Sequence, residues 1–374
     1  MFVSQARLPH LLSPSAYWCP KAFEDERDLL RKSWHVVGTK AELTSTGDFI
    51  TRNILGTPVQ IRNFDGEIRA LSNVCAHRHA MICSDLAGRS ATMKCQYHGW
   101  EYKADGSTGK ISQPKNFVPF DSPRPGLRQY SIATAGQLVF VNLTPDAAPL
   151  RDSLGEDFYL QLEERFGNQW TLSLKWWPEY SVNWKIPVEN SLEAYHVPAV
   201  HPKTFVEDPG DDRSEHVLLE HRTAFGTSLP FSPHSRIHAT FQRLEGRFIK
   251  SLGHQSTNAY WQHHVFPNLL FSFTDAISLV NCILPTGPTN CTATVFQFGR
   301  LPRSGGAMMR FWAKLWAKVE AGITKKILVE DLAIFGSIQA GLRASDQPGL
   351  LGRCEERIHR FQKYLVAQVN EPSE

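Results

Sequence analysis

Alternating apolar and polar positions between residues 48 and 73 predict antiparallel β-strands in the first part of the chain. The apolar positions are Ile50, Ile54, Val59, Ile61 and Ile68. Asp65 and Gly66 interrupt the alternation with a pair typical of a two-residue hairpin turn. An apolar run at 137–142 predicts the strand that closes this first sheet, and the prolines within 144–149 predict a linker after it.

The second half of the chain predicts another sheet and then a long helix. Apolar runs at 260–273, 276–285 and 291–299 predict strands joined by turns. From about residue 310 to residue 342, apolar residues recur at intervals of three and four, which is typical of a helix. The chain from 203 to 253 is irregular between these regions, and we expect part of it to form a lid over a substrate channel.

These patterns predict an α+β protein of two domains. Residues 1–147 are expected to form an antiparallel β-domain with an N-terminal helical extension, in which 20–33 is a short polar helix. Residues 148–374 are expected to form a second domain, an antiparallel sheet flanked by helices. A chain of 374 residues is long enough for both domains to bury a core.

An acidic residue lies on the apolar face of the predicted 310–342 helix. The face is formed by Leu328, Asp331, Phe335, Ile338 and Leu342. Burying an unpaired carboxylate is costly, whereas ligation to a cation satisfies it. Glu330 also lies near apolar neighbours, so the periodicity leaves the choice between Glu330 and Asp331 open.

Composition and charge narrow the class of protein. The net charge is +3, from 40 basic and 37 acidic residues, which is too near balance to indicate a nucleic-acid partner. No apolar run approaches the roughly 20 residues needed to span a bilayer, and the first residues lack a signal-peptide pattern. We therefore expect a cytoplasmic protein with no membrane partner. The seven scattered cysteines favour reduced thiols or metal ligands over a disulfide framework.

Two short segments each offer one thiolate and one imidazole. Cys75 and His77 form the first pair, and Cys95 and His98 form the second. Four such ligands can hold a structural zinc ion. Mixed ligands in each loop instead suit a two-iron two-sulfur cluster, with both cysteines on one iron and both histidines on the other. Histidine ligation raises the potential of such a cluster, so it could supply electrons to an oxygen-activating iron.

A second group of metal-binding residues surrounds His196 and His201. On an unbroken helix, residues five apart point about 140° away from each other. Pro198 is predicted to interrupt the helix, so that the chain turns and both imidazoles face one point. Two histidines and one carboxylate that leave positions open are the ligand set of non-haem Fe(II) oxygenases.

In the order and spacing of these motifs, the sequence resembles the catalytic (alpha) subunit of Rieske non-haem iron oxygenases over most of its length. The matching residues are Cys75, His77, Arg78, Cys95, Tyr97, His98, Gly99, Trp100, Asn183, Trp184, Lys185, Glu189, Asn190, Tyr195, His196, His201 and Pro202. The resemblance implies a Rieske-type [2Fe-2S] cluster on the Cys75, His77, Cys95 and His98 set. His79 stands where many members carry glycine.

The resemblance also implies a mononuclear Fe(II) on His196, His201 and Asp331. In the family, an aspartate followed by a Gln-x-Gly-Leu tail supplies the third ligand, and here that tail is Gln339, Gly341 and Leu342. This match favours Asp331 over Glu330.

The residue three positions before His196 implies a particular branch of the family. A carboxylate three residues before the first iron histidine bridges to a Rieske histidine in the family, and here that position is Glu193. Most ring-hydroxylating members have aspartate there, whereas glutamate is similar to the branch acting on carnitine, choline and betaines. The resemblance therefore implies monooxygenation, with aromatic cis-dihydroxylation as the alternative. It also places Asn190 among the catalytic residues.

The resemblance implies partners as well. These are a separate reductase, with or without a ferredoxin, and two further copies of the chain in a trimer. No glycine-rich dinucleotide fingerprint occurs in the sequence, which agrees with a separate reductase. Candidate substrate-pocket residues are Phe205, Phe266, Asn268, Phe271 and Phe273. Two other classes remain open: an electron-transfer Rieske protein with a purely structural second domain, and a zinc-stabilised binding module.

Overall fold

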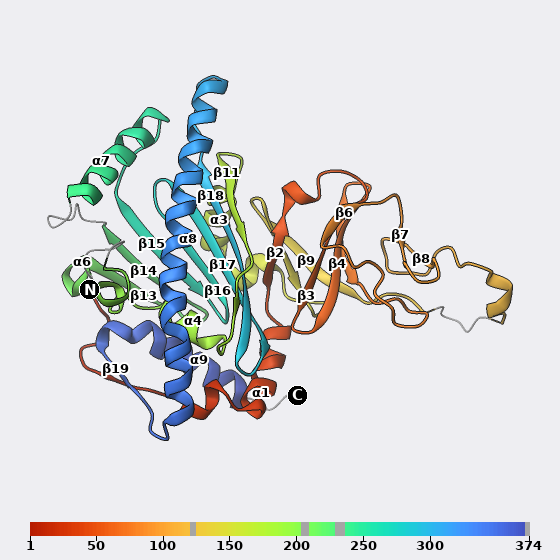
Figure 1. Cartoon of the computed structure of the whole chain (residues 1–374), viewed down its shortest axis with the longest axis horizontal. Coiled ribbons are helices and arrows are strands. Elements are labelled where there is room, and N and C mark those ends of the chain that lie inside the picture. Colours follow the sequence, from red (N-terminus) through yellow and green to blue (C-terminus); the bar gives the residue numbers. More distant parts are fainter. Residues whose placement is uncertain (120–124, 203–208, 229–235, 371–374) are drawn as a thin grey trace. The chain divides into compact units, whose positions relative to one another are not determined.

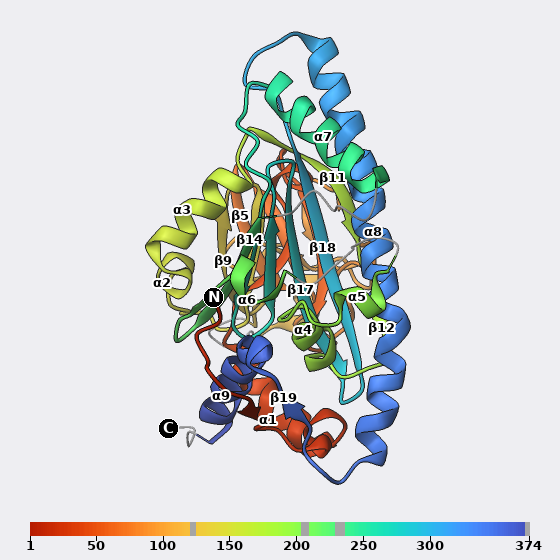
Figure 2. The ribbon, with the colours of Figure 1, turned by 90° about the vertical axis from the view of Figure 1, so that its left-hand side faces the viewer.

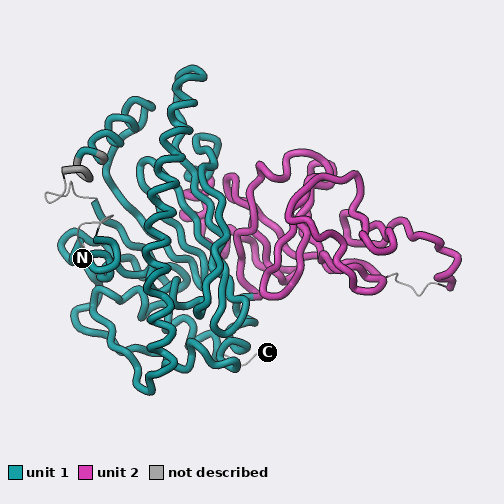
Figure 3. Tube along the Cα trace, in the orientation of Figure 1, with its two compact units in different colours: residues 1–30, 164–374 teal, residues 31–163 magenta. Residues whose placement is uncertain are grey.

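The computed structural model forms two compact units (Figure 3). It describes residues 1–119, 125–202, 209–228 and 236–370. Unit 1 contains Met1–Leu30 and Glu164–Glu374, and unit 2 contains Arg31–Glu163. This division differs from the predicted 147/148 boundary chiefly because the N-terminal extension belongs with the second half of the chain.

Side-chain contacts explain why the N-terminal extension joins unit 1. Glu26 of α1 (Pro20–Arg31) forms an ion pair with Lys185 Nζ at 2.6 Å and accepts a hydrogen bond from Trp184 Nε1 at 2.8 Å. All three side chains are buried. Further toward the N-terminus, the backbone N–H groups of Val3 and Ser4 donate to the Glu356 carboxylate. These partners lie far apart in sequence, so local patterns carry no sign of them.

Unit 2 is built on an antiparallel sheet with the order β2-β10-β9-β5-β4-β3-β6 (Figure 1). The strands predicted between 48 and 73 are confirmed, and the Asp65-Gly66 turn joins β4 to β5 with both residues at positive φ. The predicted closing strand is β10, which lies between β2 and β9. The bounds are β2 His35–Thr39, β3 Asp48–Ile54, β4 Thr57–Phe64, β5 Glu67–Ser72, β6 Ala87–Arg89, β7 Met93–Lys94, β8 Glu101–Tyr102, β9 Gln129–Ala135 and β10 Leu138–Asn142.

Unit 1 contains a second antiparallel sheet, with the order β11-β18-β17-β16-β15-β14-β13 and with β12 also paired to β18. The apolar run at 260–273 forms two strands rather than one. Pro267 lies between them, and proline cannot donate to a strand ladder. The bounds are β11 Trp170–Trp176, β12 Glu179–Tyr180, β13 Ser214–Leu218, β14 Arg222–Ser228, β15 Ala259–Val265, β16 Leu269–Phe273, β17 Ile277–Gly287 and β18 Asn290–Arg300.

Much of the region predicted to be irregular, 203–253, is regular. β13 and β14 extend the unit 1 sheet, and α7 (Arg236–Ser251) follows them. β13 and β14 form a hairpin, and β14 also pairs with β15, which comes after α7 in the sequence. The remaining candidate lid segments, 203–208 and 229–235, lie outside the described residues.

Helices complete both units. The 310–342 helix is confirmed as α8, which is 38 residues long. The helix bounds are α2 Leu150–Leu154, α3 Glu156–Arg165, α4 Lys185–Asn190, α5 Val197–Val200, α6 Gly210–Arg213, α8 Ala307–Ala344 and α9 Glu356–Asn370. A two-stranded ladder, β1 (Leu8–Pro9) with β19 (Leu350–Leu351), joins the N-terminal segment to the chain before α9. No helix in the described part of the chain combines the length and apolar character that a membrane span requires.

The two faces of the unit 1 sheet pack against different elements. Alternate residues of a strand point to opposite faces. Phe298 of β18 packs against Phe166, just after α3, with 5.3 Å between ring centroids. A Cβ added to the next residue, Gly299, would come within 2.2 Å of Ala317 Cβ on α8. We call the side of Gly299, along which α8 runs beside β18 (Figure 2), the helix face, and the side of Phe298 the phenylalanine face.

Candidate metal centres

His196 and His201 are brought together by one short turn of helix. They lie immediately before and after α5, and their ring centroids are 5.4 Å apart. The predicted role of Pro198 is wrong in detail, because Pro198 lies in the first turn of α5 and does not interrupt it. A proline is tolerated there since the N–H groups of the first turn have no partner within the helix. The rings converge because His201, with φ −114° and ψ 43°, leaves the helix.

Asp331 of α8 completes the group. Its Oδ1 lies 3.0 Å from His201 Nε2 and 3.5 Å from His196 Nε2. One ligand atom from each of the three residues lies within 4.8 Å of the other two. Asp331 and His201 are buried, whereas His196 is partly exposed. The structure therefore brings together the three residues predicted to be iron ligands, although they are separated by up to 135 positions in the chain.

A second ring of polar side chains fixes the three candidate ligands. Glu193 accepts hydrogen bonds from the backbone N–H and from Nδ1 of His196. Glu330 accepts one from His201 Nδ1 at 2.9 Å. Asn190 Nδ2 donates to Asp331 Oδ1 at 3.0 Å. With each Nδ1 bonded to a carboxylate, both imidazoles present Nε2 to the point they share with Asp331.

The pKa shifts reflect the carboxylates around this point. Burial disfavours the charged form of His196, but its bonds to Asp331 and Glu193 outweigh burial and raise its pKa to about 9. Burial acts to raise the pKa of Asp331, and hydrogen bonds from both histidines and Asn190 bring it below its ordinary value. The site therefore stabilises positive charge. Together with two imidazole nitrogens and a carboxylate oxygen, this environment fits an Fe(II) ion with positions left open.

Glu330, the rival of Asp331 in the sequence, has a different place in the structure. Neighbouring residues on a helix point about 100° apart, so the two carboxylates approach His201 from different directions. Asp331 reaches Nε2 and Glu330 reaches Nδ1 of the same ring. The structure thus uses both acids, one facing the shared point and one orienting the histidine. Periodicity alone could not separate these two positions.

In unit 2, two loops of matching geometry carry the Cys/His pairs. In the first, Cys75 N–H donates to Ala80 O and His79 N–H donates to Cys75 O. The second repeats both bonds between Cys95 and Trp100 and between Gly99 and Cys95. His79 has φ 58° and Gly99 has φ 73°, so the histidine adopts the left-handed conformation that glycine provides in the other loop.

The four candidate cluster ligands lie in a shared environment. Cys75 and Cys95 are buried in one core cluster, and the rings of His77 and His98 are 4.8 Å apart. His77 stacks on Trp100, and its buried Nδ1 has no hydrogen-bond partner among the described residues. An orphaned ring nitrogen of this kind fits metal ligation.

The arrangement favours a two-metal cluster over a single zinc ion. Among the described residues, only His196, His201 and Asp331 bring three ligand atoms within 4.8 Å of one another. The four cluster candidates are not among the described groups that could share one ion, whereas a tetrahedral zinc site requires four ligands around one ion. Ligands divided between two irons, with a cysteine pair and a histidine pair, fit this spacing.

Several residues around the sites received no role from the sequence analysis. The Tyr102 hydroxyl lies 3.0 Å from Cys75 Sγ and accepts the Ala76 N–H at 2.9 Å. Gln339 of α8 accepts the Asn183 N–H at 2.7 Å and donates to the carbonyl of Tyr17. Asn183 and Gln339 belong to the matching motifs, so the motif was the available signal. These contacts hold the backbone that leads to the segment with His196 and His201.

The predicted substrate-pocket residues that the structure describes are packed as core. Phe271 and Phe273 each lie 6.1 Å from Phe166, on the phenylalanine face, and so point away from α8. Asn268 Nδ2 donates to a backbone carbonyl at 2.6 Å, and Phe266 packs on aromatic rings of α9. Phe205 lies outside the described residues. Strand alternation decides these positions, and the direction of each strand relative to α8 was not visible in the sequence.

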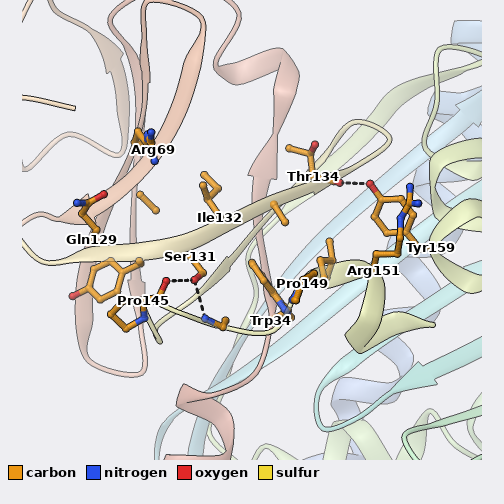
Figure 4. Close-up of a pocket in the computed structure, with 15 residues that line it drawn as sticks. Trp34, Arg69, Gln129, Ser131, Ile132, Thr134, Pro145, Pro149, Arg151 and Tyr159 are labelled. Carbon is orange, nitrogen blue, oxygen red and sulfur yellow. Dashed lines mark hydrogen bonds between the residues drawn. The ribbon is translucent and has the colours of Figure 1, made fainter. Parts of the chain in front are cut away.

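A groove of about 590 Å³ lies in unit 2 (Figure 4). It is lined by Trp34, Arg69, Arg151, Tyr159, β9 and the 145–150 region. Hydrogen bonds close its walls: Tyr159 donates to Thr134 O at 3.1 Å, and Ser131 donates to Pro145 O at 2.6 Å. No candidate metal ligand lines this groove, so we do not place the chemistry there.

Comparison with known families gives two matches along the chain. Residues 33–131 match the Rieske [2Fe-2S] domain. Residues 166–371 match the family described as ring hydroxylating alpha subunit (catalytic domain). The first match contains the Cys/His loops and the second contains the histidine and aspartate group. Both cofactors implied by these families, the Rieske cluster and a mononuclear iron, thus have a fitting ligand set here.

Curated relatives match part of the chain. The glycine betaine monooxygenase oxygenase subunit of Pseudomonas aeruginosa is 28% identical over 63% of this chain and 56% of its own length. The carnitine monooxygenase oxygenase subunit of Escherichia coli is 31% identical over 54% of each chain. The anthranilate 1,2-dioxygenase large subunit of Acinetobacter baylyi is 34% identical over 49% of this chain and 40% of that protein. The chain spans about half the length of the first two relatives.

Solved structures show the same fold. A quaternary ammonium Rieske monooxygenase superposes with a TM-score of 0.76 at 22% identity, covering 98% of this chain and 96% of that one. Naphthalene 1,2-dioxygenase from Rhodococcus superposes with a TM-score of 0.74 at 19% identity, covering 98% and 95%. Because the catalytic-domain match alone covers more than half of its length, the chain belongs to the family of ring hydroxylating alpha subunits, with a Rieske [2Fe-2S] domain before the catalytic domain.

Proposed function

We propose that the chain is a terminal oxygenase component that uses dioxygen and two electrons from a separate reductase to monooxygenate a small quaternary ammonium compound. The observation that carries the proposal is the convergence of His196, His201 and Asp331 in a chain that also holds the Cys/His loops. Similarity to the glycine betaine and carnitine monooxygenase oxygenase subunits supports the substrate class.

Each group of residues has its own proposed role. When bound, the cluster supplies single electrons and the mononuclear iron activates dioxygen. His196, His201 and Asp331 are the proposed iron ligands, and Glu330 keeps His201 in the tautomer that presents Nε2. Cys75, His77, Cys95 and His98 are the proposed cluster ligands. Asn190 is a positioning residue, since its amide holds Asp331.

Glu193 is proposed to connect the two centres between subunits. In this chain it already holds His196 through both carboxylate oxygens, and a carboxylate has further lone pairs to accept a bond from a neighbouring copy. This role implies a trimer in which a cluster of one copy serves the iron of another. Glu193→Ala removes the acceptor that orients His196 and should weaken Fe(II) binding. With Fe(II) supplied in excess, it should hold the iron and keep the cluster colour but lose substrate turnover, and Glu193→Asp should retain part of that turnover. Normal turnover by Glu193→Ala would refute the bridging role.

The function is tested by oxygen uptake with purified chain, a surrogate reductase and NADH. Glycine betaine, carnitine and choline are compared with anthranilate and naphthalene. We expect a quaternary amine to stimulate uptake and to yield one molecule of formaldehyde or hydroxylated product for each O2. Asp331→Ala should keep the cluster absorbance and lose this activity. Stimulation by none of the quaternary amines would overturn the proposed substrate class.

Aromatic cis-dihydroxylation is the second candidate. The similarity to anthranilate 1,2-dioxygenase, 34% over 190 residues, favours it. It requires both oxygen atoms of O2 to appear in a diol product. Labelled ¹⁸O2 with anthranilate would show two labelled atoms in the product under this function.

A further inference from the structure

A row of side chains crosses the helix face of the unit 1 sheet. Gln262 of β15 pairs with Ser272 of β16, Ser272 with Leu279 of β17, and Leu279 with Gln297 of β18. Gln297 lies two residues from Gly299, so the row shares the helix face. Gln297 is fully buried, yet neither its Nε2 nor its Oε1 has a hydrogen-bond partner among the described residues. We call these four paired residues the helix-face row.

Arg357 of α9 stands at one end of this row. Its Nη1 donates to Gln262 Oε1 at 2.9 Å, and its Nε donates to Thr223 Oγ1 at 3.3 Å. The side chain is 1% exposed, and its guanidinium lies 6.0 Å from the centroid of the Phe225 ring. Nη2 has no hydrogen-bond partner in the described part of the chain. Arg357 is therefore a buried cation whose hydrogen-bond acceptors are neutral, an arrangement that proteins usually avoid.

The two carboxylates whose charges act on Arg357, Glu356 and Glu193, accept hydrogen bonds from other residues. Glu356 accepts two backbone bonds from the N-terminal segment and one from His216 Nδ1 at 2.8 Å. Glu193 accepts two bonds from His196. Burial lowers the pKa of Arg357 to about 10, although the charges of these two acids act against this shift. The guanidinium thus has spare donor capacity and an incompletely balanced charge.

The same region borders the proposed iron ligands. Glu193, which acts on Arg357, bonds directly to His196. Tyr260 lies on the helix face two residues before Gln262, and its hydroxyl is 3.3 Å from Ser272 Oγ. The charges of both Arg357 and Asp331 act on Tyr260. Arg357, the helix-face row and the ligand group are therefore linked by contacts and charge interactions within unit 1.

We propose that Arg357 binds the carboxylate of the substrate, so that the enzyme selects molecules with a carboxylate at one end and the carbon to be oxidised at the other. A guanidinium matches a carboxylate in charge and in its forked geometry, and burial strengthens the bond. This inference rests on the proposed function. Within it, Arg357 selects zwitterionic betaines over analogues such as choline, which has a hydroxyl group in place of the carboxylate.

The test measures binding rather than turnover. Iron-loaded protein is titrated anaerobically by calorimetry with two matched pairs of probes, glycine betaine against choline and benzoate against benzamide. Wild-type protein is compared with Arg357→Gln and Arg357→Lys. Arg222→Gln is the matched control, because Arg222 lies next to Thr223 on β14 and so belongs to the opposite face of the sheet.

We expect wild type to bind glycine betaine more tightly than choline. Arg357→Gln should raise the Kd of the carboxylate probe roughly 10- to 100-fold, which is the range for losing a hydrogen bond to a charged group. The Kd of the neutral-end probe should change little, Arg357→Lys should be intermediate, and Arg222→Gln should resemble wild type. Circular dichroism and the cluster absorbance report folding. If Arg357→Gln does not fold, the comparison of wild type with Arg357→Lys decides.

Two results would overturn the assignment: wild type that binds neither carboxylate probe, or a folded Arg357 variant that binds the carboxylate probe as tightly as wild type does. A different result separates this inference from the proposed function. If benzoate binds in an Arg357-dependent way and glycine betaine does not bind, the carboxylate site stands and the quaternary ammonium substrate class fails.

Discussion

Replacing Glu26 with alanine should destabilise unit 1 strongly, because Glu26 is the only described carboxylate partner of a buried lysine. The Lys185 ammonium is fully buried, and the Glu26 side chain is 6% exposed. The same carboxylate accepts a hydrogen bond from the buried Trp184 indole. Lys185 and Trp184 precede the segment that carries His196 and His201, two of the proposed iron ligands. The change therefore tests what holds that segment in place.

The expected loss of stability comes from the two groups that lose their partner, the Lys185 ammonium and the Trp184 indole. Removing one partner of a buried ion pair costs about 3–5 kcal/mol, because the other charge stays buried and unpaired. An indole N–H without an acceptor adds about 1–3 kcal/mol, and the two costs overlap. We expect Glu26→Ala to lower the free energy of unfolding by about 4–6 kcal/mol. At about 2–4 °C per kcal/mol for a unit of this size, Tm falls by about 10 °C or more.

The assay is thermal and urea unfolding followed by circular dichroism, with Glu24→Ala as the control. Glu24 lies on the same helix and pairs with Arg27, but both side chains are largely exposed, so its loss should cost less than about 1 kcal/mol. The double variant Glu26→Leu with Lys185→Met should recover most of the loss, since it removes both charges. A Tm of Glu26→Ala within about 2 °C of wild type would refute the reasoning.

Three further predictions concern single residues. Glu330→Ala should weaken Fe(II) binding roughly 10- to 100-fold, because His201 loses the acceptor that orients it, and Fe(II) titration that gives equal affinities would contradict this. His79→Gly should raise the unfolding free energy by about 0.5–1 kcal/mol in thermal melts, since the left-handed conformation is costly for histidine; a lower Tm would show that its side chain compensates. Burial, reinforced by the charge of Glu245, raises the pKa of Glu320 from 4.5 to about 8. The contribution of Glu320 to the free energy of unfolding is therefore complete below about pH 4.5 and is lost as the pH rises to about 8. Glu320→Gln should therefore raise Tm more at pH 8.5 than at pH 5, and an equal shift at both pH values would count against the assignment.

The sequence was most informative where the chemistry is local. Cys75 with His77 and Cys95 with His98 each lie in one turn, so their spacing in the sequence is close to their spacing in space. The strands between 48 and 73 and helix α8 were visible for a similar reason, since their apolar positions follow the period of the element that forms. The hairpin at Asp65-Gly66 required only the left-handed conformations that these residues tolerate.

Contacts between distant segments could not be predicted from local sequence patterns. Periodicity could not separate Asp331 from Glu330, because the answer depends on which side of His201 each carboxylate approaches. The pocket prediction selected Phe271 and Phe273 by residue type, but pairing of β16 in the sheet turned both toward Phe166. The N-terminal extension joined unit 1 through Glu26, whose partners lie about 160 residues away.

Residue order alone indicated the two Cys/His pairs, the His196 and His201 pair, and the periods of the main strands and the long helix, because these features depend on neighbours within a few positions. The tertiary structure decided which acid faces the shared point, which face of the sheet lies under α8, and where the buried Arg357 finds its partners. The physical reason is that a side chain's direction is fixed only when its element packs against others. Burial, charge and hydrogen bonding then act between residues that the chain itself keeps far apart.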